Sequence, residues 1–94
     1  MPYFVYMLLS NHKYKFISYV GYTNDLKKRL SLHNSSKGAK FTKGKKWVII
    51  YQKKYISKSK ALKDEYKLKK DYKFRNKIKN NFIKNEKNIY NTSL

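Results

Sequence analysis

Two runs of β-branched, aromatic and apolar residues, 3–9 (YFVYMLL) and 16–22 (FISYVGY), open the chain. Runs of this length and composition are typical of buried strands. Because only the polar residues 10–15 (SNHKYK) connect them, the two strands are expected to pair as an antiparallel hairpin. The connecting loop is expected to be longer than two residues. A chain of 94 residues is one domain with a single modest core, so the other elements must pack onto this hairpin.

The rest of the chain alternates helical and strand-like patterns. Thr23 or Asn24 offers an N-cap, with Asp25 in the first turn, for a helix that ends near Asn34. There follow a basic loop over 35–46, a strand over 47–55, a helix that Ser57 or Ser59 caps and that ends near Lys70, and a third helix from Phe74 that frays near Asn88. This β-β-α-β-α-α order predicts an α+β domain over 1–84, with a three-stranded antiparallel sheet flanked by helices, and a polar tail over 85–94.

The charge favours a polyanionic partner. The sequence has 24 Lys and Arg against 5 Asp and Glu, a formal net charge of +19, which predicts binding to nucleic acid that weakens steeply with salt. Nearly all the cations are lysine, with arginine only at positions 29 and 75, and an AT-rich genome produces the same bias. Charge therefore predicts binding and says nothing about chemistry.

Composition also limits the compartment and the metal chemistry. The chain has no cysteine, so any metal has to be held by oxygen ligands or by His12 and His33. The apolar run 2–9 is too short to span a bilayer, and no basic segment precedes it. We expect a soluble, cytoplasmic protein.

Tyr6 and Tyr19 lie inside the two predicted strands, and Gly21 follows at the end of the second. Each tyrosine is equally explained as a core residue, since the chain has ten. Gly21 allows either a bulge or the close approach of a ligand to the backbone.

Arg29 and His33 share one side of the first predicted helix, four residues apart. In a lysine-rich chain, an arginine on a half-buried face indicates a need for the planar, bidentate guanidinium, which suits a phosphate. A buried ion pair is the alternative for Arg29. His33 is either a packing or capping residue or a group that assists phosphate binding or proton transfer.

Glu65 falls on the apolar stripe of the second predicted helix, with Ala61 and Leu68. A carboxylate in such a place needs a cation or an ion pair, so Glu65 is a candidate ligand for one Mg²⁺ and alternatively pairs with Arg29 or a lysine. Asp64 is expected to point toward solvent.

The basic loop combines cations, small residues and one aromatic ring. This composition suits contact with a phosphate backbone and stacking of a base, and a solvated charge run is the alternative. The candidate nucleic-acid-binding residues are Lys37, Lys40, Phe41, Thr42 and Lys43.

Taken together, these positions resemble the GIY-YIG nuclease superfamily, and the similarity is closest to its short, stand-alone bacterial members. The resemblance covers roughly residues 3–70. Val5-Tyr6 and Tyr19-Val20-Gly21 stand at its two name-giving motifs. The other matching positions are Thr23, Leu26, Arg29, Leu30, His33-Asn34, Lys37–Thr42, Ser59, Ala61-Leu62 and Glu65.

The resemblance implies a metal-dependent endonuclease acting on DNA more than on RNA. Tyr19 would activate water and Tyr6 would position water or phosphate. Arg29 would stabilise the pentacovalent phosphate, His33 would assist, and Glu65 would hold one Mg²⁺ or Mn²⁺.

Three departures from the family pattern limit this reading. The first motif reads Phe4-Val5-Tyr6, and Tyr22 stands where many relatives have a cation. The downstream asparagine of several relatives has three candidates here, at positions 76, 80 and 81. With no room for a targeting domain, the chain is expected to select substrate structure (single strands, flaps or junctions), to cut weakly without preference, or to take specificity from a partner. The rivals are a non-catalytic DNA- or RNA-binding module and a ribosome-associated basic protein.

Overall fold

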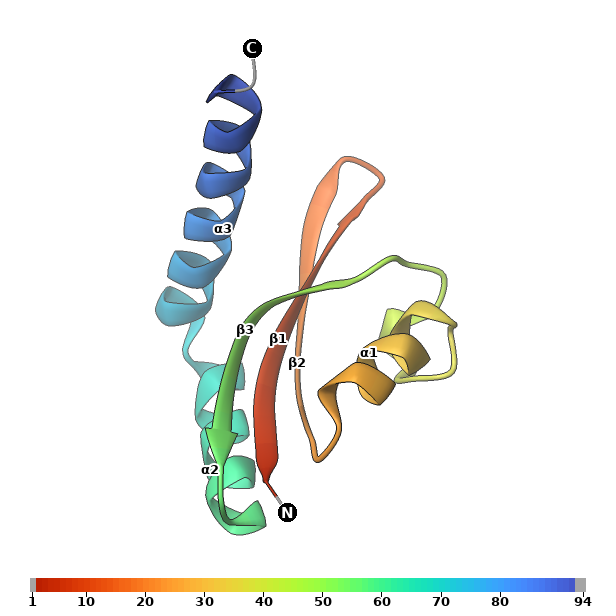
Figure 1. Cartoon of the computed structure of the whole chain (residues 1–94), viewed down its shortest axis with the longest axis vertical. Coiled ribbons are helices and arrows are strands. Elements are labelled where there is room, and N and C mark those ends of the chain that lie inside the picture. The colour runs from red at the N-terminus through yellow and green to blue at the C-terminus, as the bar shows by residue number, and fades with distance from the viewer. Residues whose placement is uncertain (1, 93–94) are drawn as a thin grey trace.

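A computed structural model describes the backbone of residues 2–92 and the side chains of residues 2–86. Figure 1 shows a sheet with helices packed against it. The elements in chain order are β1 (Tyr3–His12), β2 (Lys15–Thr23), α1 (Leu26–Asn34), the 3₁₀ helix η1 (Lys40–Thr42), β3 (Val48–Tyr55), α2 (Lys58–Lys70) and α3 (Tyr72–Thr92). The predicted α+β class and element order are confirmed. The domain boundary at residue 84 and the polar tail stay predictions, and side chains from residue 87 onward lie outside the described part.

β1 is the central strand of the sheet. The strand order is β2-β1-β3, and β1 pairs antiparallel with both neighbours. Its residues from Val5 to Ser10 are all buried, because helices cover both faces of the sheet. This double burial explains why β1 reads as a continuous apolar run and not as an alternating one.

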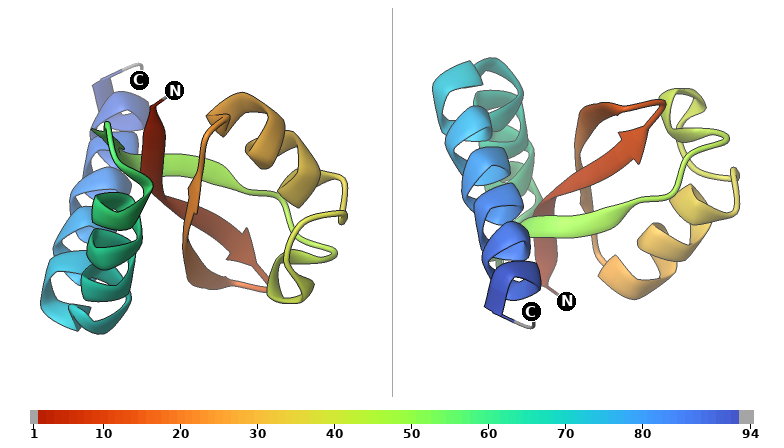
Figure 2. Two further views of the ribbon diagram at one scale, coloured as in Figure 1. Left: turned by 90° about the horizontal axis from the view of Figure 1, so that it is seen from below. Right: turned by 90° about the horizontal axis from the view of Figure 1, so that it is seen from above.

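Side-chain alternation along β1 divides the core into two parts. Val5 and Met7 point to one face, where they pack with Ala61 and Leu68 of α2. Tyr6 and Leu8 point to the other face, where α1 and Trp47 cover them. Figure 2 shows α2 and α3 on one side of the sheet and α1 on the other. The face under α1 therefore receives Tyr6.

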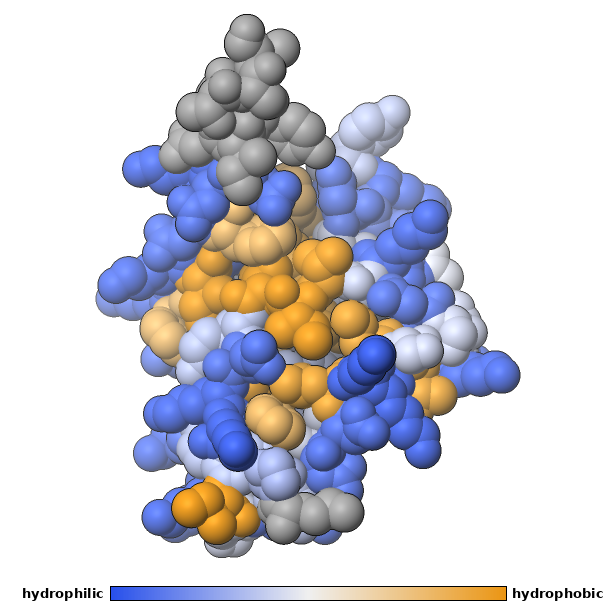
Figure 3. Space-filling view, in the orientation of Figure 1, coloured by the Kyte–Doolittle hydropathy of each residue, from blue (hydrophilic) through white to orange (hydrophobic). Residues whose placement is uncertain are grey.

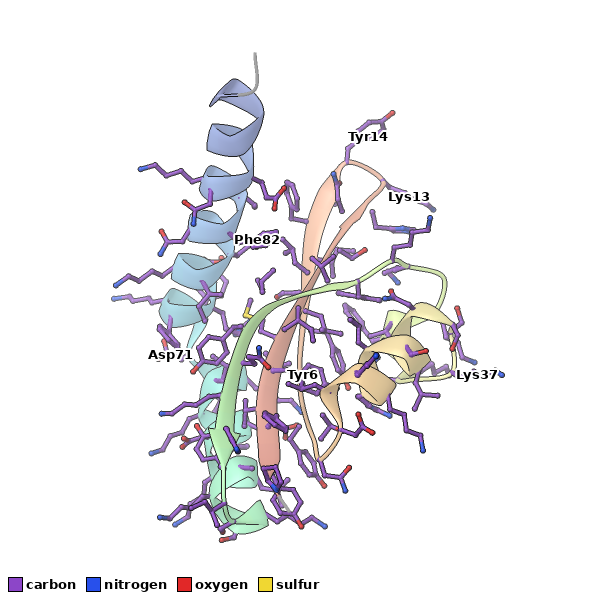
Figure 4. The ribbon with its side chains drawn as sticks, viewed as in Figure 1. Tyr6, Lys13, Tyr14, Lys37, Asp71 and Phe82 are labelled. Carbon is purple, nitrogen blue, oxygen red and sulfur yellow. The ribbon has the colours of Figure 1, made fainter. Side chains whose placement is uncertain are left out.

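The hairpin closes with a two-residue turn, so the expectation of a longer loop was wrong. His12 pairs with Lys15, and the two residues between them both have positive φ, 51° at Lys13 and 67° at Tyr14. Figure 4 shows this turn at the tip of the hairpin, where Tyr14 extends into solvent. The polar residues 10–12 continue the strand because backbone pairing with β2 does not depend on apolar side chains.

The turn should be improved by residues suited to positive φ. Each non-glycine residue in the left-handed region costs roughly 1–2 kcal/mol, and Asn-Gly is the preferred pair in such hairpins. We expect Lys13→Asn/Tyr14→Gly to raise the free energy of unfolding by about 1 kcal/mol, or the melting temperature by about 4–8 °C. Thermal unfolding followed by circular dichroism measures this. Lys43→Asn, at an exposed residue with φ −62°, is the control and should give no gain. An unchanged melting temperature in the double variant would contradict the turn geometry.

The predicted N-cap of α1 was wrong, whereas one of the two candidates for α2 is confirmed. Asp25, placed by the sequence analysis in the first turn, is itself the cap of α1 in place of Thr23 or Asn24, because its carboxylate accepts a hydrogen bond from the Lys28 amide at 3.1 Å. The Thr23 hydroxyl instead accepts from the Asp25 amide and fixes the turn that precedes the helix. Ser57 caps α2 by accepting from the Lys60 amide at 3.3 Å.

Asp64 is half-buried, so the expectation that it points toward solvent was wrong. Its carboxylate accepts a hydrogen bond from the Tyr55 hydroxyl of β3, and this contact ties α2 to the edge of the sheet. Burial, followed by the hydrogen bond to Asp64, raises the pKa of Tyr55 well above its ordinary value. Helical spacing alone gave no sign of a hydrogen-bond partner on a strand nine residues earlier.

An apolar groove of about 500 Å³ lies between the far half of the hairpin and α3. Figure 3 shows apolar side chains gathered over this face, with hydrophilic residues on both flanks. Its main apolar lining residues are Leu9, Phe16, Val48, Phe82 and Ile83. In Figure 4, Phe82 points from α3 toward the hairpin. The groove lies on the α3 side of the sheet, opposite the face that carries Tyr6.

Candidate active site

The hydroxyl of Tyr6 is the centre of a hydrogen-bonded cluster on the α1 face of the sheet. It lies 2.9 Å from Nε2 of His33, and Nε of Arg29 donates to it at 3.4 Å. Tyr6 and His33 are fully buried, and Arg29 is half-buried. β1 supplies the tyrosine, and one side of α1 supplies the other two residues. Arg29 and His33, which were predicted to share one side of a helix, both form hydrogen bonds with the Tyr6 hydroxyl.

The hydrogen bonds around His33 fix the position of its proton. The Thr42 hydroxyl donates to the carbonyl of Ala39 at 2.8 Å, so it accepts at the 2.9 Å contact with Nδ1 of His33. Nδ1 of His33 therefore carries the proton, and the neutral ring presents Nε2 as an acceptor. The Tyr6 hydroxyl donates to Nε2. The cluster thus runs in one direction, from Arg29 through Tyr6 and His33 to Thr42.

The protonation states agree with this direction. Burial, and then the charge of Arg29, lowers the pKa of His33, so the ring is neutral at pH 7. Burial raises the pKa of Tyr6, and Arg29 opposes that shift. The ordinary values of 10.0 and 6.5 already differ by 3.5, and both shifts widen the gap. Moving the Tyr6 proton fully to His33 is therefore unfavourable in the free protein, and Tyr6 rests in its neutral form.

Two glycines allow this cluster to pack against the backbone. A Cβ atom on Gly21 would lie 2.5 Å from the Tyr6 hydroxyl oxygen, and one on Gly38 would lie 2.5 Å from Nδ1 of His33. Neither space holds a methyl group. The sequence left Gly21 as a bulge or as a site of close approach, and the group that approaches it is the Tyr6 side chain.

Tyr19 lies beside this cluster. Its ring centroid is 5.1 Å from that of His33 and 6.3 Å from that of Phe41, with which it is stacked at an interplanar angle of 20°. Hydrogen bonding to Tyr6 raises the pKa of Arg29, and Tyr19 adds to that shift. Arg29 therefore lies within reach of both tyrosines and keeps its charge.

Glu65 lies on α2. Its side chain is 15% exposed and pairs with Lys69 one turn later at 3.6 Å, which is the lysine alternative that the sequence left open. Burial is the main cause of the raised pKa of Tyr6, and the charges of Tyr19 and Glu65 contribute to it. The ion pair is solvent-accessible on the side of Lys69, so it contributes little stability and a stronger cation can replace the lysine.

The carboxylate of Glu65 fits a single hard divalent ion. Among the described side chains, no three of the His, Asp and Glu residues lie close enough to hold a metal together. Glu65 fits an ion whose remaining ligands are water and substrate oxygens, as Mg²⁺ commonly accepts. A two-metal cluster does not fit this donor set.

The basic loop divides into exposed and buried residues. Lys37, Lys40, Phe41 and Lys43 are exposed, and Figure 4 shows Lys37 pointing away from the domain. Thr42 is fully buried, so its side chain supports His33 and does not lie on a surface that a phosphate would contact.

Two positions that the family resemblance includes have supporting roles that the sequence analysis did not assign. The side chain of Asn34, the last residue of α1, donates to the Trp47 carbonyl and accepts from the Trp47 amide, which fixes the end of α1 to the start of β3. Gly38 packs against His33. The sequence alone does not indicate either role. Of the downstream asparagines, Asn76 is half-buried, Asn80 and Asn81 are exposed, and no hydrogen bond among the described side chains joins them to the cluster.

Comparison with known proteins gives a family match. The profile of the GIY-YIG catalytic domain matches residues 2–80. A UPF0213 protein of Oceanobacillus iheyensis is 48% identical over 52 residues, which cover 54% of this chain and 60% of that protein. Another of Bacillus velezensis is 42% identical over 67 residues (70% and 65%), and a third of Bacillus subtilis is 47% identical over 53 residues (55% and 54%). The chain thus spans less than two thirds of the curated relatives that it matches. No solved structure matches it significantly.

Proposed function

The chain belongs to the family of GIY-YIG catalytic domains, and on that premise we propose that it is a metal-dependent endonuclease that hydrolyses DNA phosphodiester bonds. The observation that carries this proposal is the hydrogen-bonded cluster of Arg29, Tyr6 and His33. A module that only binds nucleic acid needs surface cations. It has no use for a buried tyrosine that donates to a neutral histidine beside a charged arginine.

We propose that Tyr6 accepts the proton that the attacking water loses. As water gives a proton to the Tyr6 oxygen, the hydroxyl proton of Tyr6 passes to Nε2 of His33, its hydrogen-bond partner. The hydroxide attacks phosphorus, the bond to the leaving oxygen breaks, and that oxygen takes up a proton from solvent, to which His33 then returns the proton that it received. The lowered pKa of His33 makes the ring a transient carrier, because the imidazolium releases its proton readily.

Arg29 is proposed to stabilise the pentacovalent phosphate. Its Nε is used by Tyr6, and its terminal nitrogens remain for phosphate oxygens, which suits the planar guanidinium. A divalent ion held by Glu65 would neutralise charge on the phosphate and favour loss of the water proton. The family resemblance implies Tyr19 as the base; the hydrogen bond from the Tyr6 hydroxyl to His33 supports Tyr6 in that role instead.

The substrate that we propose is DNA with unpaired bases, whether single strands, flaps or junctions. The Phe41 ring is 53% exposed and stacks on Tyr19, with Nζ of Lys45 5.4 Å from its centroid. An exposed ring with a cation beside the site suits stacking of a base that has left its pair. Lys37, Lys40 and Lys43 are proposed to contact the phosphate backbone.

Target choice beyond substrate structure is proposed to come from a protein partner. The match to the catalytic domain covers residues 2–80, most of the 94 residues of this chain. No helix within residues 2–92 is long and apolar enough to cross a membrane. A cytoplasmic location stays a prediction. The alternative function is a DNA- or RNA-binding module that keeps the fold without catalysis.

The deciding experiment is cleavage of single-stranded, duplex and branched DNA, and of RNA, with Mg²⁺, Mn²⁺ or EDTA. We expect cleavage of unpaired DNA with a divalent ion and none with EDTA. Glu65→Gln should reduce the rate by about 1,000-fold and leave binding in EDTA unchanged, since several kcal/mol of charge stabilisation depend on the ion. Glu86→Gln, in the groove on the other face, is the matched control and should keep full activity. Binding without cleavage by the wild type would favour the module, and cleavage that survives Glu65→Gln would reveal a contaminant.

A further inference from the structure

A second pocket adjoins the Tyr6 cluster at the start of β1. It has a volume of about 450 Å³, within the range of pockets that bind small molecules. Four segments that are distant in sequence meet there: the start of β1, the end of β2, α1, and the first turn of α2. Its lining residues are Tyr3, Tyr22, Thr23, Asn24, Arg29 and Lys58. Of these, only Arg29 belongs to the cluster described above.

The charges of this pocket are unbalanced. Arg29 and Lys58 line it, and no carboxylate does. Within the described residues the one ion pair joins Glu65 to Lys69, so neither of the two cations has an anionic partner. Two unpaired cations at the rim of one pocket favour a ligand with more than one negative charge.

The other lining groups suit a nucleobase. Tyr3 and Tyr22 are half-buried and pack against the core beneath the pocket, so their rings are held in place. Asn24 and Thr23 add hydrogen-bonding groups at the pocket. Rigid aromatic rings stack bases with little loss of entropy, and amides bind base edges. Lys58 brings a positive charge to the same pocket from α2.

Arg29 joins the pocket to the catalytic cluster. The same side chain that donates to Tyr6 lines the pocket, so a phosphate on Arg29 lies at the border of both. Building on the proposed nuclease function, we propose that this pocket binds the nucleotide next to the scissile phosphate. The base lies against Tyr3 and Tyr22, and the next phosphate along the strand binds Lys58. A base can enter only when it is unpaired or flipped out of the duplex.

Thymidine 3′,5′-bisphosphate is the probe, because its two phosphates can engage Arg29 and Lys58 while its base enters the pocket. Binding is measured by calorimetry and by amide NMR shifts in EDTA, where no cleavage occurs. We expect shifts at residues 3, 22–24 and 58. Lys58→Ala should weaken binding about 3- to 10-fold, as expected for one phosphate contact at low salt. Lys63→Ala, exposed on the same helix, is the matched control and should bind as wild type.

Inorganic phosphate separates the base contact from the charge contact. Tyr22→Leu should weaken binding of the bisphosphate and leave that of inorganic phosphate unchanged. Thermal unfolding of this variant checks the core. Shifts confined to the 37–43 loop, or an unchanged dissociation constant in Lys58→Ala, would overturn the pocket assignment.

The results distinguish failure of the pocket proposal from failure of the nuclease proposal. If the wild type binds the bisphosphate in this pocket and cuts nothing, the nuclease proposal is contradicted and the pocket proposal stands. If the wild type cuts DNA with the same KM and kcat as Lys58→Ala, the pocket proposal is contradicted and the nuclease proposal stands. With both proposals correct, Lys58→Ala raises KM several-fold and leaves kcat near that of the wild type, since Lys58 does not contact Tyr6 or His33.

Discussion

Tyr6→Phe should reduce cleavage by about 100- to 10,000-fold, the range for loss of a group that transfers a proton. The variant keeps the buried ring and removes the one hydroxyl that joins Arg29 to His33. Tyr19→Phe is the matched comparison, because it removes a hydroxyl from the neighbouring strand on the same face. We expect a loss of about 10-fold or less there, since Tyr19 stacks with its neighbours and has no hydrogen-bonded base among the side chains of residues 2–86.

Single-turnover rates at saturating DNA measure both losses, and binding in EDTA shows that the substrate is still held. Tyr6→Phe leaves the buried Nε2 of His33 without a donor, which costs about 1–3 kcal/mol of stability. The assay therefore runs well below the melting temperature of that variant. A larger loss in Tyr19→Phe than in Tyr6→Phe would return the role of base to Tyr19, as the sequence alone favoured. Equal, small losses in the two variants would contradict a role in proton transfer for either tyrosine.

The fold was predictable where a local pattern had one physical explanation. The apolar run of β1 predicted a buried strand because no exposed strand tolerates such a sequence. Arg29 and His33 were paired from their spacing alone, since α1 places residues four apart on one side. The half-burial of Glu65 followed from the stripe that it shares with Ala61 and Leu68 in the same way.

The sequence did not predict the role of a side chain whose hydrogen-bond partner lies elsewhere along the chain. Thr42 looked like a surface residue of a basic loop, and η1 turns it inward onto His33. Asp64 looked solvated until β3 brought Tyr55 to it. The two-residue turn was missed because Lys13 and Tyr14 are not residues that favour positive φ. In each case, tertiary packing outweighs the local preference on which a sequence reading depends.

Adding one methyl group at Gly21, which is not itself part of the hydrogen-bonded cluster, should inactivate the site. Gly21 lies opposite Tyr6 in the register of β1 and β2. A Cβ there would meet the hydroxyl oxygen at 2.5 Å and the ring carbon that carries it at 2.6 Å. The ring is buried and held on its other side by α1, so it cannot turn aside without breaking its hydrogen bonds to His33 and Arg29.

We therefore expect Gly21→Ala to lower cleavage by about 100-fold or more, because displacing a reacting group by about 1 Å has that effect. Overpacking should also reduce the free energy of unfolding by about 1–3 kcal/mol. Gly44→Ala is the matched control. Gly44 has φ +73°, so alanine there is strained, yet no atom lies within 4 Å of its added Cβ. That variant should lose about 1 kcal/mol of stability and keep its cleavage rate.

Combining Gly21→Ala with Tyr6→Phe separates a specific effect on Tyr6 from general damage. If Gly21→Ala acts by displacing the Tyr6 hydroxyl, removing that hydroxyl leaves little more to lose. The double variant should then cut at nearly the rate of Tyr6→Phe alone, because losses from groups that act as one unit do not multiply. Losses that multiply would show that the methyl group damages the site by another route. Cleavage by Gly21→Ala within about 3-fold of wild type would show that Tyr6 has more room than the packing around it allows.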